Sequence, residues 1–102
     1  MTYHCKYKYR EPNTVVAKWG SGKPVIGIMG KDDALKGLGQ NTVPYCSSRH
    51  GFGHGCGHNL ISPACVSAAV AAKVAIETEG LSGTIKFLGC PTEEGGWGKL
   101  YI

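Results

Sequence analysis

The chain has 102 residues, 42% of them hydrophobic and 18% charged, with a formal net charge of +4. This length excludes a multidomain protein and allows one modest core. No apolar signal region or membrane-length run precedes the cysteines, so we expect no membrane partner. The 5 cysteines are an odd and scattered set, which favours a reducing cytoplasm over a disulfide framework.

The first twelve residues are basic and aromatic. Tyrosines alternate there with basic side chains, which is the period-two pattern of a half-buried or edge strand. Basic residues interleaved with aromatics can also bind nucleic acid. We favour the strand and expect no nucleic-acid partner. The alternating residues are Tyr3, Cys5, Tyr7 and Tyr9 against His4, Lys6, Lys8 and Arg10.

Two strands are predicted next. Residues 14–19 are rich in β-branched side chains and end at a Gly-Ser-Gly-Lys turn, so they predict a strand that enters a hairpin. Its predicted hairpin partner is the apolar run Val-Ile-Gly-Ile-Met at residues 25–29, which is typical of a strand covered on both faces. Pro24 can begin this second strand but could not lie in its middle.

Residues 30–57 are dense in turn-forming residues and show no convincing period. The exception is a short turn of helix expected at residues 33–38. A loop of this length is uncommon in a compact domain unless it carries a site. We therefore interpret it as a functional loop.

The alanine-rich residues 64–79 predict a helix. Asn59 or Ser62 is the expected cap, Pro63 is tolerated in the first turn, and Gly80 supplies the stop. The apolar side of this helix carries Val66, Val70, Val74 and Ala75.

Residues 84–90 predict a further strand that ends at Pro91. Strand, helix and strand form a crossover unit, and such crossovers are almost always right-handed, so the strands at residues 25–29 and 84–90 should be parallel. The sequence therefore predicts an α/β fold. In open parallel sheets, ligands bind beyond the carboxyl ends of the strands.

Residues 50–60 hold three of the 4 histidines together with Cys56. Cys56 and His58 are one residue apart, and thiolate and imidazole are the ligands that zinc prefers. Because Cys56 lies near the predicted amino end of the helix, the helix dipole should favour its thiolate, so Cys56 should be metal-bound or unusually reactive compared with Cys65. The alternative is a glycine-rich surface loop with solvated histidines and an idle thiol.

Carboxylates follow both parallel strands. Asp32 and Asp33 come after the first strand, and Glu93 and Glu94 after the second. The topology brings these groups and the Cys-Gly-His loop to one sheet edge, where carboxylates complement imidazole and thiolate as metal ligands. A glutamate beside a metal can also act as a general base. The alternative is a solvated charged turn.

Four stretches together resemble the metal-dependent aminoacylase and carboxypeptidase family, a group of zinc metallopeptidases and amidohydrolases, and within it the aminobenzoyl-glutamate hydrolase branch. Their order and spacing match jointly over roughly residue 13 to the end. The stretches are GSGKPVIGIMG at residues 20–30, DALKGLGQ at 33–40, GHGCGHNL at 53–60 and GTIKFLGCPTEEGGWGK at 83–99.

The resemblance implies that Cys56, His58 and Glu94 are ligands of a divalent metal, with zinc favoured over manganese or cobalt. It implies that Glu93 is the general base and that Asp33 supports the metal centre. Family members usually hold two metals and form homodimers through a further domain. The implied fold is a partial three-layer α/β/α zinc-exopeptidase-like catalytic domain with a mixed, mainly parallel sheet.

Several positions depart from the family pattern. Lys31 stands where an acidic residue is usual, and Lys36 where a proline usually follows Asp-Ala-Leu. His54 matches a common histidine without an assigned role. The family's further histidine ligands and its dimerisation domain are not matched, and Arg49 and Lys99 are candidates for a substrate carboxylate clamp by charge alone. We interpret residues 13–102 as a partial catalytic domain, an amino-terminal fragment, and residues 1–12 as an unmatched segment.

The first functional hypothesis is a cytoplasmic metal-dependent amidohydrolase, or a fragment of one, that hydrolyses N-acyl amino acids or dipeptides such as aminobenzoyl-glutamate. The alternative is a noncatalytic metal-binding remnant of such an enzyme. Because the matched positions supply three ligands, we expect the isolated chain to hold one ion and to be a poor enzyme or none.

Overall fold

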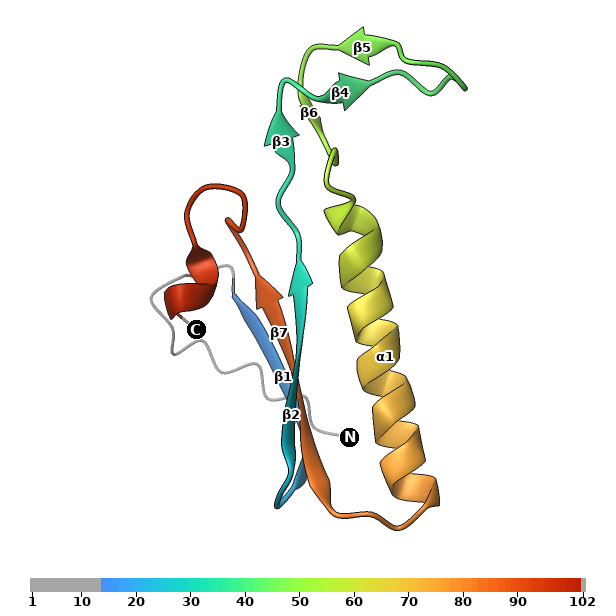
Figure 1. Ribbon diagram of the computed structural model, residues 1–102, viewed down its shortest axis with the longest axis vertical. Helices are drawn as coiled ribbons and strands as arrows, with labels where there is room; N and C mark the ends of the chain where they lie inside the picture. Colours follow the sequence, from blue (N-terminus) through green and yellow to red (C-terminus); the bar gives the residue numbers. More distant parts are fainter. Residues whose placement is uncertain (1–13, 102) are drawn as a thin grey trace.

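The computed structural model describes residues 14–101, with the side chain of Tyr101 left aside. A three-stranded sheet carries one long helix on one face (Figure 1). The sheet is built from β1 (Val15–Ser21), β2 (Val25–Lys31) and β7 (Gly83–Cys90), and the helix is α1 (His58–Thr78). The strand expected within residues 1–12 lies outside the described residues.

The strand order is β1-β7-β2, with β7 in the centre. β2 and β7 are parallel, as the crossover argument predicted. The predicted hairpin between β1 and β2 is wrong, because β1 pairs antiparallel with β7 instead. β7 lies between β1 and β2 and is bound to the turn that joins them. The Thr84 N–H donates to the Pro24 carbonyl and the Thr84 hydroxyl donates to the Gly22 carbonyl, each at 2.9 Å.

The sheet is mixed, as expected, but it is not mainly parallel, since one of its two strand pairs is antiparallel. The expected three-layer arrangement is also only partly present. Over residues 14–101, α1 covers one face of the sheet and no second helical layer covers the other. The apolar run at residues 25–29, typical of a strand covered on both faces, therefore has one face without a helix in the described chain, and Val25, Ile26 and Met29 are about half exposed.

Helix α1 begins more than one turn earlier than predicted, at His58. The cap is Gly57 in a left-handed conformation (φ 74°) without a side-chain hydrogen bond, so neither Asn59 nor Ser62 caps the helix. Pro63 lies inside it. The predicted stop is confirmed: Gly80 has a φ of 62°, and the Leu81 N–H donates to the Ile76 carbonyl at 3.0 Å.

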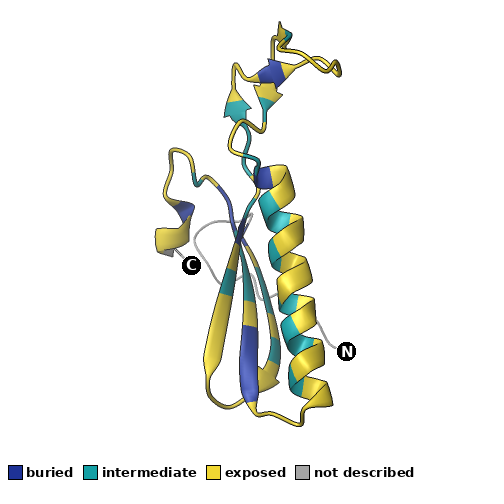
Figure 2. Cartoon of the chain, turned by 45° about the vertical axis from the view of Figure 1, so that its right-hand side comes forward, coloured by how far each residue is buried: buried dark blue, intermediate teal, exposed yellow. Residues whose placement is uncertain are grey.

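The apolar surface of α1 is wider than the face that packs on the sheet. Ile61, Cys65 and Ile76 are partly buried, and the partly buried residues of α1 lie along the side that faces the sheet (Figure 2). The valines at 66, 70 and 74 remain 45%, 50% and 48% exposed. By length and composition alone this 21-residue helix could also cross a membrane. Its contacts with β2 and β7 instead make it the second layer of an α/β unit.

The loop expected at residues 30–57 is largely a two-step β arm that projects beyond the sheet (Figure 1). The predicted helical turn at residues 33–38 is wrong, because β3 (Leu35–Lys36) pairs with β6 (Phe52–Gly53). Farther out, β4 (Gly39–Gln40) pairs with β5 (Ser48–Arg49). After β7 the chain turns into a short 3-10 helix, η1 (Gly98–Tyr101).

The core is small. Among the described hydrophobic residues, Ile85 and Cys90 are the buried ones, and both lie on the central strand β7. Side-chain hydrogen bonds therefore matter for the docking of α1. The Ser62 hydroxyl donates to the Lys31 carbonyl, and the Cys65 thiol donates to the Met29 carbonyl at 3.2 Å. Both contacts join the first half of α1 to the end of β2.

Replacing Ser62 with alanine should lower the free energy of unfolding by about 1 kcal/mol, because the partly buried Lys31 carbonyl loses its donor. Urea denaturation followed by circular dichroism measures this change. Ser67→Ala is the matched control, since the Ser67 hydroxyl donates to Pro63 within the helix, and its effect should stay within about 0.5 kcal/mol. Equal losses in the two variants would contradict this docking role.

Candidate metal centre

Five side chains predicted for the site meet at one end of the sheet. Asp33 follows β2, the pair Glu93 and Glu94 follows β7, and Cys56 and His58 lie at the amino end of α1. The predicted convergence at the carboxyl ends of the parallel strands is therefore present.

His58 is the most enclosed of these groups, with 2% of its surface exposed. Its Nδ1 lies 2.9 Å from the backbone oxygen of Asp33 and 3.0 Å from Asp33 Oδ1. A carbonyl oxygen can only accept, so Nδ1 donates in this contact, and Nε2 is the ring nitrogen left to bind a metal when the ring is neutral. Such an oriented imidazole is the usual form of a metal-binding histidine.

The free Nε2 of His58 faces carboxylates. It lies 3.6 Å from Glu94 Oε1 and 3.6 Å from Glu93 Oε2, which is too long for hydrogen bonds. One ligand atom each from Cys56, His58 and Glu94 lie within 4.8 Å of one another. Ligands about 2.0–2.3 Å from a tetrahedral zinc ion are separated by about 3.3–3.6 Å, so this donor set fits zinc with little movement.

Gly57 sets the geometry between the two ligands on the loop. Its left-handed conformation turns the chain between Cys56 and His58, so that both side chains reach the same group. A Cβ at Gly57 would meet nothing within 4 Å, so a side chain there is disfavoured by the backbone conformation alone. The glycine-rich loop at residues 50–60 thus includes one glycine that the site requires.

Glu93 is held by two lysines. Its Oε1 lies 2.7 Å from Lys31 Nζ and 3.2 Å from Lys99 Nζ. The contact with Lys31, and after it the contact with Lys99, lowers the pKa of Glu93 below its usual range. The same contact raises the pKa of Lys31. The two lysines therefore favour the carboxylate form of Glu93.

The thiol of Cys56 behaves differently from the sequence-based expectation. Its contact with Glu94, followed by burial and the charges of Glu94 and Glu93, raises the pKa of Cys56. The charge of Lys31 opposes this effect and is the smaller influence. A raised pKa is contrary to an unusually reactive free thiol, whereas the expectation of a metal-bound thiolate stays a prediction, because a bound cation would stabilise the thiolate.

Other sequence candidates lie outside this group. Asp32 and His54 are exposed. The backbone oxygen of His54 accepts a hydrogen bond from the Gly57 N–H at 2.9 Å. Arg49 is exposed on the arm. Lys99, considered as a substrate clamp by charge, contacts Glu93 instead. Lys31 departs from the family pattern, but no pattern in the sequence indicates that it pairs with Glu93, which lies far along the chain.

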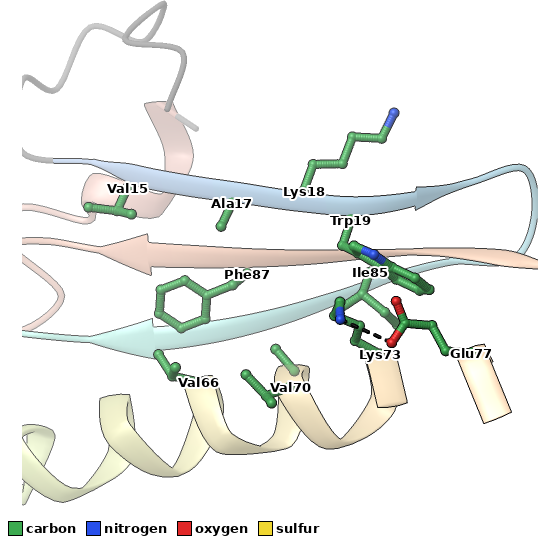
Figure 3. A pocket seen from close by; sticks show the side chains of 11 residues that line it. Val15, Ala17, Lys18, Trp19, Val66, Val70, Lys73, Glu77, Ile85 and Phe87 are labelled. Carbon is green, nitrogen blue, oxygen red and sulfur yellow. Dashed lines mark hydrogen bonds and ion pairs between the residues drawn. The ribbon is translucent and has the colours of Figure 1, made fainter. Parts of the chain in front are cut away.

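A separate cavity of about 670 Å³ lies between α1, β1 and β7 (Figure 3). Its walls include Val66, Val70, Ile85 and Phe87. At one end, Lys73 Nζ lies 3.0 Å from Glu77 Oε2 and 5.5 Å from the centre of the Trp19 ring. None of the metal-binding candidates lines this cavity, so it is not the candidate site.

Asp33 connects the site to the fold. Its Oδ2 accepts the Glu94 N–H at 2.9 Å, while its Oδ1 and its carbonyl face His58. Burial acts to raise the pKa of Asp33, but the backbone N–H groups of Glu94, Asp33 and Glu93 and the charge of His58 outweigh it and hold that pKa below its usual range.

The lowered pKa of Asp33 predicts acid sensitivity. Because its folded pKa lies below its unfolded pKa, its stabilisation is complete above the unfolded value and is lost as the pH falls through the folded value. Asp33→Asn should lower the free energy of unfolding by about 1–2 kcal/mol near neutral pH. It should also reduce the fall of that free energy at acidic pH, called here the acid limb. Denaturation curves from neutral pH down to about pH 3 measure both effects. Asp32→Asn, at the exposed neighbouring position, is the control, and an unchanged acid limb in Asp33→Asn would contradict the prediction.

Three known proteins are similar in sequence to this chain. The chain is 47% identical over 94 residues to one subunit of the p-aminobenzoyl-glutamate hydrolase of Escherichia coli, covering 89% of this chain and 20% of that protein. It is 44% identical over 51 residues to Xaa-Arg dipeptidase of Mus musculus, covering 48% of this chain and 12% of that protein. It is 35% identical over 79 residues to N-acetyl-L-cysteine deacetylase of Bacillus subtilis, covering 78% of this chain and 18% of that protein.

The chain thus spans about a fifth or less of the length of these relatives. No solved structure matches it at a significant level. Residues 28–102, which include every residue of the candidate site, match the model of Peptidase family M20/M25/M40. The chain therefore belongs to this peptidase family.

Proposed function

We propose that this chain supplies the metal-binding group and the general base of a metal-dependent amidohydrolase. The observation that carries the proposal is the convergence of Cys56, His58 and Glu94 within 4.8 Å, with Glu93 beside them. The substrate class would be N-acyl amino acids or dipeptides such as aminobenzoyl-glutamate. The names of the relatives, a hydrolase, a deacetylase and a dipeptidase, support this class.

In this proposal Cys56, His58 and Glu94 hold a divalent ion, with zinc favoured by the thiolate and imidazole donors and manganese or cobalt as alternatives. A bound ion of this kind acidifies water and polarises a carbonyl. Asp33 fixes the tautomer of His58 through Nδ1. The Oε2 of Glu93, which faces the same space as His58 Nε2, takes the proton of the attacking water. We place this chemistry in the cytoplasm, where the thiol ligand stays reduced.

A noncatalytic metal-binding role is the second candidate, and one observation favours it. Lys31 and Lys99 both contact Oε1 of Glu93 and lower its pKa. A carboxylate stabilised in this way is a weaker base than a free one. Metal binding without hydrolysis is therefore the expected result if these contacts persist when the substrate is bound.

The metal site itself is tested by thiol labelling. Zinc should slow the labelling of Cys56 by about tenfold or more, and a chelator should reverse the effect, because a metal-bound thiolate is withheld from the reagent. Cys46 is an exposed free thiol on the arm and serves as the internal control. Mass spectrometry of the labelled peptides separates the two sites. Equal labelling of both thiols with and without zinc would contradict the proposed ligand set.

The catalytic role is tested with the zinc-, manganese- and cobalt-loaded chain on a panel of acyl amino acids and aminobenzoyl-glutamate. Turnover should be slow, since the described chain offers three ligands for one ion. Glu93→Gln should reduce it by about 10²–10⁴-fold without changing the metal content. Glu79→Gln, at the exposed carboxyl end of α1, is the matched control. If the metal-loaded wild-type chain forms product no faster than the same chain without metal, the catalytic role is contradicted and the noncatalytic metal-binding role is supported.

A further inference from the structure

Lys31 occupies an unusual place for a lysine, inside a group of potential metal ligands. It is the last residue of β2, paired with Cys90 of β7, and its carbonyl accepts the Ser62 hydroxyl of α1. The backbone that carries this side chain is therefore fixed by three elements. The side chain is 34% exposed, and its ammonium lies 2.7 Å from Glu93 Oε1.

The carboxylate of Glu93 lies between two positions that can hold positive charge. One oxygen, Oε1, contacts the Lys31 ammonium, and the other, Oε2, faces His58 Nε2 at 3.6 Å. A metal ion on His58 would therefore lie near one oxygen of this carboxylate while Lys31 holds the other. Two-metal hydrolases hold their ions about 3.5–4 Å apart, so a second ion beside this one would have to lie close to Glu93.

We propose that the Lys31 ammonium takes the place of a second metal ion, so that the site binds one divalent cation at Cys56, His58 and Glu94 and excludes another from Glu93. The inference rests on the metal site of the proposed function. A second divalent ion at Glu93 would meet a fixed positive charge that already uses the available oxygen. Lys31 is thus a specificity residue that sets the number of ions.

Lys99 does not replace Lys31 in this role. It contacts the same oxygen from η1 at 3.2 Å, but its side chain is 43% exposed and it begins from a short 3-10 helix at the end of the described chain. The charge of Lys31 also acts on Glu94 and Cys56, two of the three ligands. Removal of the Lys31 charge should therefore change cation binding much more than removal of the Lys99 charge.

The test is metal binding by the full chain, measured by equilibrium dialysis against zinc with elemental analysis, and by the visible absorption of cobalt as a second readout. The wild-type chain should bind one ion. Lys31→Gln should bind that ion about tenfold more tightly, because a nearby positive charge is lost. Lys31→Glu should bind a second ion, since it adds a carboxylate where the ammonium was. Lys99→Gln is the matched control and should change the affinity less than about threefold.

Circular dichroism checks that each variant keeps the helix, and the two substitutions at position 31 remove the charge in different ways. Two ions on the wild-type chain would overturn the inference, as would equal affinities in wild type, Lys31→Gln and Lys31→Glu. In both cases the proposed metal centre would stand. No binding of zinc or cobalt by wild type or by any variant would instead contradict both the metal centre and the role of Lys31.

Discussion

The contacts of one aspartate hold the site together. The carbonyl of Asp33 accepts from His58 Nδ1, and its Oδ2 accepts from the Glu94 N–H. These two bonds join the segment after β2, the start of α1 and the turn after β7, which are otherwise distant in sequence. Without them the imidazole would have no fixed tautomer, and Glu94 would not face it. The geometry of the metal ligands therefore depends on a residue that is not itself a ligand.

The sequence was most informative where a physical rule connects distant segments. The apolar runs of β2 and β7, with a helix between them, require a parallel pair, and that pair brings Asp33, His58 and Glu94 to one edge. Local patterns were less informative. No local pattern indicates that β7 separates β1 from β2, because strand order depends on which strand fills the space beside the turn and not on proximity along the chain.

The helix and the arm illustrate the same difference. The start of α1 at His58 is set by the left-handed Gly57 and by the contact of His58 with Asp33, and neither resembles the expected Asn or Ser cap. A helical turn was expected at residues 33–38, but Leu35 pairs with Gly53 and Lys36 with Phe52 across the arm. The sequence also does not indicate which charges pair, since the ion pairs of Glu93 with Lys31 and Lys99 form only in the folded chain. Tertiary contacts overrode local preference in each case.

The docking of α1 beside β2 has a consequence for association between chains. β2 is an edge strand, and the Thr84 N–H to Pro24 carbonyl bond fixes which of its residues point toward β7. Alternate residues point outward, so the carbonyls of Met29 and Lys31 lie on the open side of the strand. The Cys65 thiol and the Ser62 hydroxyl occupy these two acceptors. A strand from another molecule that added to β2 would have to displace both, so the helix protects the end of the sheet that carries the site from edge-to-edge aggregation.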